Sequence, residues 1–300
     1  MPVDARNPII VANDSATDNW SGEYAMLLAN AGGPPLVGII VNPSSYWPRL
    51  EASAGGWNQL IAAARASGLR NIPDPTVSAA DRLVRPADGE IDHTTANASA
   101  GAKLIVEQSA RLSVPSRPLV VVTGSRLTDV ADAYLMDNTV VDRVVVVSAL
   151  GSHTMSGGIM GWPNGELDAW ADWIVGQRFR YVQISGYYDQ TDDVPSARAG
   201  ELPDNPLGMW MADKVSSVFS IPMSSDQIAV LSVGLPGFVS AVGRAVVDTS
   251  AAFDTMTGPP LRAQAGGAAD GSVWVVSSCA GPMAADRLWQ MLLDPRTFGR

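Results

Sequence analysis

Oxygen-bearing side chains gather directly behind the first apolar run of the sequence. The run Pro8–Ala12 (PIIVA) leads into Asn13–Trp20 (NDSATDNW), which holds two carboxylates and two carboxamides. These oxygens are ligands that hard metal ions prefer, and the same residue types form Asx turns and cap helices. Both interpretations stay open from these residues alone.

The scarcity of sulfur and imidazole restricts the possible metal chemistry. Cys279 is the only cysteine, which excludes an intramolecular disulfide and a cysteine-based metal site. The two histidines, His93 and His153, exclude a multi-histidine zinc centre. A bound metal would therefore have oxygen ligands. We expect Cys279 to be buried and His93 to lie on the surface.

Short β-branched runs alternate with helical patterns as far as about residue 220. The runs are apolar at nearly every position, as expected of strands covered on both faces. This alternation predicts an α/β fold with a parallel sheet and helices on both faces. The predicted strands are Pro8–Ala12, Leu36–Val41, Leu119–Thr123, Arg143–Ser148 and Tyr181–Ser185. The predicted helices are Glu23–Ala31, Trp57–Ser67, Asn97–Leu112, Thr128–Met136, Asp168–Val175 and Leu207–Phe219, with Thr128 and Asp168 as N-caps.

The later part of the chain has a looser pattern. The stretch Tyr187–Pro206 is polar and contains prolines, so we expect a long loop that is either a lid or solvated surface. We expect its acidic residues to be solvated. No linker or fixed-period repeat divides the sequence, which favours one domain over residues 1–300. The acidic residues of the loop include Asp189, Asp192 and Asp193. The later predicted elements are a helix at Asp226–Val233, strands at Arg244–Asp248 and Val273–Ser277, and a helix at Pro282–Leu293.

Charge and hydropathy restrict the partners. Asp and Glu number 30 against 20 Lys and Arg, which gives a net charge of −10. Such a surface repels phosphate backbones and anionic lipids, so we expect neither nucleic acid nor a membrane surface as a partner. No stretch approaches the roughly 18 apolar residues of a membrane span, and the N-terminal apolar run is too short for a signal peptide. A soluble cytoplasmic protein is the default expectation.

In a parallel α/β sheet, ligands bind beyond the carboxyl ends of the strands. The residues there are Asn13, Asp14, Asn42, Thr123, Gly124 and the segment Ser148–Asn164. The segment Asn13–Asn19 resembles the DTDPGxDD signature of the calcium-dependent, inosine-uridine-preferring nucleoside hydrolases. Three later segments resemble further motifs of that family, in the same order. They are Thr123–Ala131 (GPLTN-x-A), Asn164–Ala171 (EFNxxxDPEAA) and Ser225–Val230 (HDPLAV).

The resemblance implies a Rossmann-like fold and hydrolysis of an N-ribosyl bond. In that family a calcium ion holds the ribose diol and a water molecule, and a carboxylate ligand of the metal deprotonates that water. The water then attacks the anomeric carbon of an oxocarbenium-like transition state, which nearby anionic charge stabilises. The resemblance also implies a small nucleoside or riboside as the substrate, and a homo-oligomer by analogy.

The metal-binding positions of the family fall on four segments of this sequence. Asp14 falls on the catalytic base, which is also a ligand. Asn19 falls on a second carboxylate ligand, and Asp226 on the C-terminal one. The backbone carbonyl ligand falls on Thr123 by residue type and on Gly124 by strict counting. The resemblance therefore implies calcium bound by Asp14, Asn19, Asp226 and Thr123.

The substrate-binding positions are fewer and less regular. Asn164 falls on a ribose-contacting asparagine, and Asp18 on the first residue of an Asp-Asp pair. The asparagine that follows the second strand matches Asn42 by residue type, whereas counting back from the next helix points nearer Ser45. The expected substrate contacts are Asp18, Asn42, His153, Trp162 and Asn164.

The sequence departs from the family at several of these positions. Asn19 removes one negative charge from the metal site, which weakens calcium binding. Trp162 replaces a glutamate that contacts the 5′-hydroxyl, which suggests a bulkier or less polar group there. Ser225 replaces the histidine that protonates the leaving group in part of the family, and a hydroxyl cannot act as that acid. His153, beyond a strand end, is a candidate substitute for the acid, although an exposed loop histidine is the alternative.

Two functions therefore remain open from the sequence. The first is a divergent N-glycosidase, and the second is a catalytically silent relative that binds a nucleoside or sugar at a weakened metal site. Indoles that stack on a purine can replace an acid in some members of the family, whereas packing in the core is the alternative role for such side chains. The tryptophans in segments that could reach the pocket are Trp20, Trp47, Trp162 and Trp210.

Overall fold

The computed structural model describes nine stretches of the chain. They are residues 1–16, 20–44, 47–149, 168–184, 193–217, 226–250, 252–253, 261–263 and 273–299. Within these stretches, no helix combines the length and hydrophobicity that crossing a bilayer requires.

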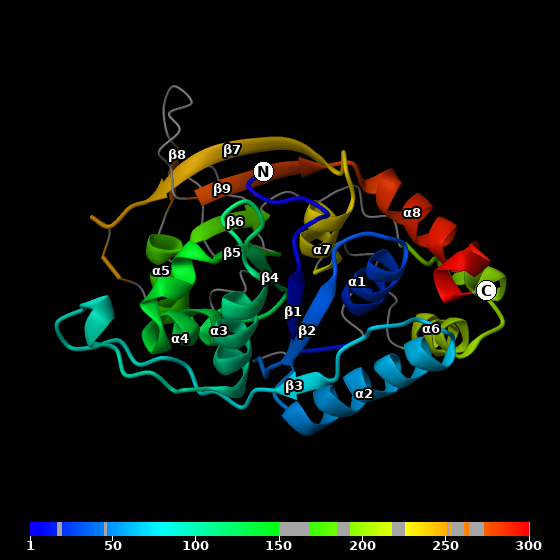
Figure 1. Ribbon diagram of the computed structural model, residues 1–300, viewed down its shortest axis with the longest axis horizontal. Coiled ribbons are helices and arrows are strands. Elements are labelled where there is room, and N and C mark those ends of the chain that lie inside the picture. The colour runs from blue at the N-terminus through cyan, green and yellow to red at the C-terminus, as the bar shows by residue number, and fades with distance from the viewer. Residues whose placement is uncertain are drawn as a thin grey trace.

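The described strands form one nine-stranded sheet in the order β3-β2-β1-β4-β5-β6-β9-β7-β8 (Figure 1). Every neighbouring pair from β3 to β9 is parallel, and β7 runs antiparallel to both β9 and β8. The predicted α/β sheet is therefore confirmed. The strands are β1 (Ile9–Asn13), β2 (Leu36–Val41), β3 (Pro75–Val77), β4 (Leu119–Thr123), β5 (Val144–Ser148), β6 (Arg180–Ile184), β7 (Val239–Val247), β8 (Leu261–Ala263) and β9 (Val273–Cys279).

Helices cover both faces of the sheet, and the strands send alternate side chains to each face. Ile9 and Val11 pack in one core with α1, α2, α6, α7 and α8, whereas Ile10 and Ala12 pack in the other with α3, α4 and α5 (Figure 1). This double burial explains the continuous apolar runs in the sequence. The helices are α1 (Ser21–Asn30), α2 (Leu50–Ala66), α3 (Ala100–Leu112), α4 (Thr128–Met136), α5 (Ala169–Arg178), α6 (Pro206–Ser217), α7 (Gln227–Gly234) and α8 (Gly281–Leu293).

One of the two predicted N-caps is confirmed and the other is wrong. Asp168 caps α5, because its carboxylate accepts the Ala171 N–H at 3.1 Å. Thr128 lies inside α4, whose N-cap is Leu127, and its hydroxyl donates to Asp168 at 2.7 Å instead. Burial raises the pKa of Asp168, although these hydrogen bonds and that from the Leu83 N–H act in the opposite direction. The Thr128–Asp168 contact joins α4 to α5.

The predictions of which single side chains are buried and which are exposed have mixed outcomes. Cys279 is buried, which raises the pKa of its thiol to about 12, so the predicted packing role is confirmed. His93 is exposed as predicted and its ring lies 2.7 Å from the carboxylate of Asp88. The prediction of a solvated Asp193 is wrong, because this side chain is buried. Asp189 and Asp192 lie outside the described residues.

Glu23 is an unusual member of the core. Its side chain, on the first turn of α1, is fully buried, and neither carboxylate oxygen accepts a hydrogen bond from another residue that the structure describes. Burial raises the pKa of this carboxyl from an ordinary value of 4.5 to about 8. The carboxyl therefore stays protonated in the folded protein at pH values where it ionises in the unfolded chain.

We expect Glu23 to make the protein less stable as the pH rises. Between pH 4.5 and about pH 8 the folded state binds the extra proton, so raising the pH favours unfolding. The loss from this group is on the order of 1 kcal/mol per pH unit. The Tm of Glu23→Gln, compared with that of the unsubstituted chain, should therefore be raised more at pH 8 than at pH 5. Exposed Glu107→Gln is the control, and an equal Tm difference at both pH values would contradict the expectation.

Candidate functional site

Asn13, the last residue of β1, connects three segments at the carboxyl edge of the sheet. Its Oδ1 accepts the Asp14 N–H at 2.7 Å, and its Nδ2 donates to Asp226 Oδ2 and to Ser21 Oγ, both at 3.0 Å. Its backbone carbonyl lies 3.4 Å from the Asn42 nitrogen, which donates to it. The start of α1, the start of α7 and the end of β2 therefore meet around one carboxamide. The sequence placed Asn13 at the strand end, but it did not indicate this connecting role.

The Asp226 carboxylate lies against the backbone of Gly124. A Cβ atom added at Gly124 would lie 2.3 Å from Asp226 Cγ and 2.5 Å from its Oδ2, so only glycine fits here. Asp226 occupies the N-cap position of α7 without capping it through its side chain, which instead accepts from Asn13. The structure thus brings Asp226 to the carboxyl end of β4, beside Thr123.

Asp14, Ser15 and Ala16, which follow Asn13, are buried. Asp14 is 3% exposed, and Trp20, which precedes α1, has a φ of 61°. A left-handed conformation costs a residue with a Cβ atom roughly 1 kcal/mol or more, so surrounding contacts must maintain it. The Trp20 indole is buried in the core on the α1 side of the sheet. This burial supports the packing interpretation of Trp20 rather than a stacking role.

Asn42, at the carboxyl end of β2, has its carboxamide fixed by neighbours. Its Nδ2 donates to Asp129 at 3.0 Å, and its Oδ1 accepts from Ser125 Oγ at 2.6 Å. Asp129 is buried on α4 and also accepts from Ser78 Oγ at 2.5 Å and Ser99 Oγ at 2.8 Å. Three donors satisfy this buried carboxylate, as buried charges require. The sequence did not indicate this role of Asp129, because the side chains that donate hydrogen bonds to it come from distant segments.

The donors at this edge match the preferences of a hard cation. Asp14 and Asp226 are carboxylates, and the Thr123 carbonyl accepts the Ala149 N–H at 2.9 Å and keeps a second lone pair. Oxygen donors of this kind suit calcium. Considering only the described stretches, no group of three or more His, Cys, Asp or Glu side chains forms a metal site. The predicted residues Asp18, Asn19, Ser45, His153, Trp162, Asn164 and Ser225 lie outside those stretches.

A cavity of about 370 Å³ lies beside this edge. Trp47, which is 38% exposed, lines it opposite the first two turns of α2, where small residues leave space. A Cβ atom at Gly56 would approach Ala16 no closer than 3.6 Å. The cavity has room for a flat group next to Ser15 and Ala16, which follow Asp14 in the chain. Its lining is Ser15, Ala16, Trp47, Pro48, Arg49, Ala52, Ser53 and Gly56.

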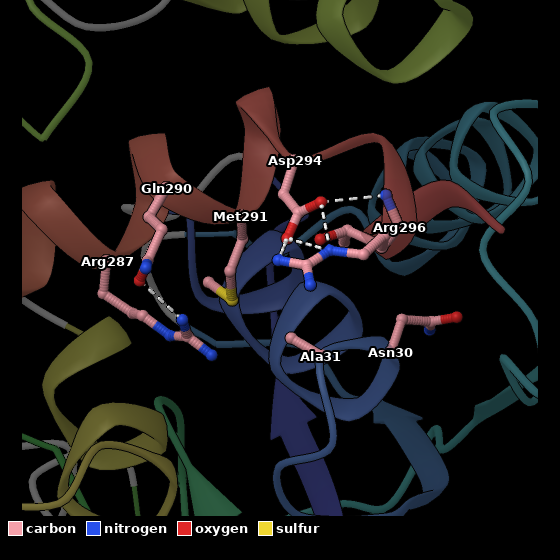
Figure 2. Close-up of a pocket in the computed structure, with 8 residues that line it drawn as sticks. Asn30, Ala31, Arg287, Gln290, Met291, Asp294 and Arg296 are labelled. Carbon is pink, nitrogen blue, oxygen red and sulfur yellow. Dashed lines mark hydrogen bonds and ion pairs between the residues drawn. The ribbon is translucent and has the colours of Figure 1, made fainter. Parts of the chain in front are cut away.

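A second cavity of about 370 Å³ lies on the side of the sheet where the amino ends of the strands are (Figure 2). It is formed where α1 ends at Asn30 and α8 meets the following turn. Because α1 leads into β2, this end of α1 lies at the amino ends of the strands. Arg296 forms an ion pair with Asp294 at 2.8 Å, and Arg287 donates to Gln290 at 2.7 Å. This cavity and the candidate site therefore lie at opposite ends of the strands.

Structural comparison finds solved structures with a similar arrangement of strands and helices. An inosine-uridine-preferring nucleoside hydrolase from Bacillus anthracis matches with a TM-score of 0.66 and 14% identity, covering 97% of this chain and 99% of the other. An inosine-guanosine nucleoside hydrolase matches with a TM-score of 0.65 and 13% identity over 95% and 99%. A plant nucleoside hydrolase matches with a TM-score of 0.63 and 14% identity over 95% and 98%. The chain has the fold of the nucleoside hydrolases.

Comparison of sequences gives less information about this chain than comparison of structures. No family model matches the chain, and no curated protein matches it. The likeness therefore lies in the arrangement of strands and helices, which extends over nearly the whole length of each structure compared.

Proposed function

We propose that this chain hydrolyses the N-glycosidic bond of a nucleoside or a related riboside. The observation that supports the proposal is the meeting of Asp14, Asp226 and the Thr123-Gly124 backbone around Asn13, at the ligand-binding edge of a nucleoside-hydrolase fold. Cleavage of an N-ribosyl bond needs an activated water and anionic groups close to a sugar that becomes cationic. Two buried carboxylates at one edge meet both needs.

Asp14 is the proposed general base. Its carboxylate takes a proton from the attacking water as the water oxygen forms a bond to the anomeric carbon. The bond from that carbon to the base nitrogen breaks, and its electron pair leaves with the nitrogen. Asp14 and Asp226 are both buried, so their charge acts on the sugar through a medium of low dielectric constant. Asn13 keeps Asp226 oriented by its 3.0 Å hydrogen bond.

Calcium is the proposed cofactor, and Asp14, Asp226 and the Thr123 carbonyl would hold it together with Asn19. When bound, calcium supplies a Lewis acid that makes a water more acidic and binds the ribose diol. The proposed substrate contacts are Asn42, whose carboxamide has a fixed orientation, and Asp18, His153, Trp162 and Asn164. The cavity beside Trp47 could hold a planar part of the substrate.

The test is a panel of purine, pyrimidine and nicotinamide ribosides, with free base measured by chromatography in calcium and in a chelator. We expect base release that depends on calcium. Nicotinamide riboside should be cleaved fastest, because its base leaves as a neutral molecule and needs no proton from an acid at position 225. No release from any riboside, with no calcium-induced rise in Tm, would contradict the proposal. Riboside-induced stabilisation without release would favour the silent binding protein.

A further inference from the structure

Asp193 is a buried carboxylate with no place in the proposed reaction. It is 2% exposed, although it belongs to a polar and acidic stretch of the sequence. Burying a carboxylate is costly unless hydrogen bonds compensate for the lost water. Three described hydrogen-bond partners of Asp193 are 34, 96 and 169 positions away in the sequence, so local sequence patterns do not indicate its burial.

Three helices on the same face of the sheet donate to Asp193. Tyr24 of α1 donates its hydroxyl to Oδ2 at 2.9 Å, and the Gln227 amide of α7 donates to the same oxygen at 3.4 Å. Trp289 of α8 donates its indole N–H to the Asp193 backbone carbonyl at 3.0 Å. Asp193 therefore links α1, α7 and α8 at one buried point.

The contact with α7 is the one that bears on the candidate site. Gln227 directly follows Asp226, so the first turn of α7 is held from two sides, by Asn13 at Asp226 and by Asp193 at Gln227. All eight residues of α7 are buried. Because α7 is buried on every side, it has no solvent-facing polar side that would set its rotation about its axis. The polar contacts at its first turn therefore act together with core packing to select one rotation.

We propose that Asp193 is a positioning residue that fixes the rotation of α7 through Gln227 and so keeps the Asp226 carboxylate against Gly124. The inference rests on the proposed role of Asp226 in the function above. Rotation of α7 by a fraction of a turn would move the Asp226 oxygens away from the Asn13 amide. In this proposal Asp193 acts on the site through α7 and is not itself a substrate contact.

The test compares two donors to the same carboxylate oxygen. Gln227→Met keeps the length and volume of the side chain but removes the contact that orients α7, whereas Tyr24→Phe removes the hydroxyl that donates from α1. The readouts are calcium affinity from the dependence of Tm on calcium, and amide hydrogen exchange in α7. Gln227→Met should weaken calcium binding about tenfold and speed exchange in the first turn of α7. Tyr24→Phe should lower Tm and leave calcium affinity within about twofold.

A double-variant cycle distinguishes positioning from general support of the fold. Asp193→Ala should weaken calcium binding as much as Gln227→Met, and the double variant should be no weaker than either. Asp193→Asn, which keeps an acceptor oxygen, should restore part of the affinity. Equal losses in Tyr24→Phe and Gln227→Met, or additive losses in the double variant, would overturn the inference. A chain that binds no calcium and cleaves no riboside would overturn the proposed function, whereas unchanged exchange in α7 would overturn the role of Asp193 alone.

Discussion

Replacing Asp14 by asparagine is expected to lower kcat/KM for the best riboside of the panel by about 10²- to 10⁴-fold, the usual contribution of a general base. The amide has nearly the shape of the carboxylate but cannot accept a proton from water. It also removes one negative charge from beside the developing cation of the sugar. Steady-state rates of base release, measured in saturating calcium, provide the comparison.

An exposed carboxylate provides the matched control for this change. Asp204→Asn alters the same functional group on the surface and should leave kcat/KM unchanged. Circular dichroism of Asp14→Asn should match that of the unsubstituted chain, since Asn13 holds the backbone nitrogen of residue 14 rather than its side chain. A rate for Asp14→Asn within threefold of the unsubstituted chain would rule out Asp14 as the base.

Gly124→Ala is expected to disturb the site without adding or removing a charge. The new methyl group would lie 2.3 Å from Asp226 Cγ, so Asp226 or the β4 end must move. Overpacking of this kind costs typically about 1–3 kcal/mol of unfolding free energy. We also expect the calcium-induced rise in Tm to disappear and kcat/KM to fall at least tenfold. Urea denaturation measures the unfolding free energy. Thermal denaturation with and without calcium measures the rise in Tm, and rates of base release give kcat/KM.

Gly55→Ala is the control for the glycine substitution. A Cβ atom at Gly55 of α2 meets no atom within 4 Å, and alanine favours a helix over glycine by about 1 kcal/mol. This variant should therefore be slightly more stable and equally active. If Gly124→Ala bound calcium with unchanged affinity, the close contact with Asp226 would have no role in metal binding.

The parallel sheet could be predicted from the sequence because its strands are buried on both faces. The β2 and β4 boundaries agree with the prediction at both ends. The first two turns of α2 contain Ala, Ser and Gly without an apolar period, so the predicted helix began at Trp57 instead of Leu50. The start of β7 was missed for a related reason, because its first half is exposed and lacks the apolar run of a covered strand.

The candidate site could be predicted only in part. Asp14 and Asn42 follow strands and Thr123 ends one, and the rule for parallel sheets places all three at one edge. Asp226 follows no strand, so only the family motif pointed to it. Its contact with Gly124, like the burial of Asp193, depends on packing between segments far apart in the chain. Local sequence patterns contain no information about such pairings.

The hydrogen bond between Asn13 and Asp226 has a consequence for biosynthesis. It joins residues 213 positions apart, so the two halves of the candidate site leave the ribosome at very different times. Asn13 emerges early, and the carboxylate that it orients emerges only after the central strands have been synthesised. A nascent or truncated chain that ends before α7 therefore has no complete site. The proposed site is therefore completed only late in synthesis, when α7 packs against the end of β1.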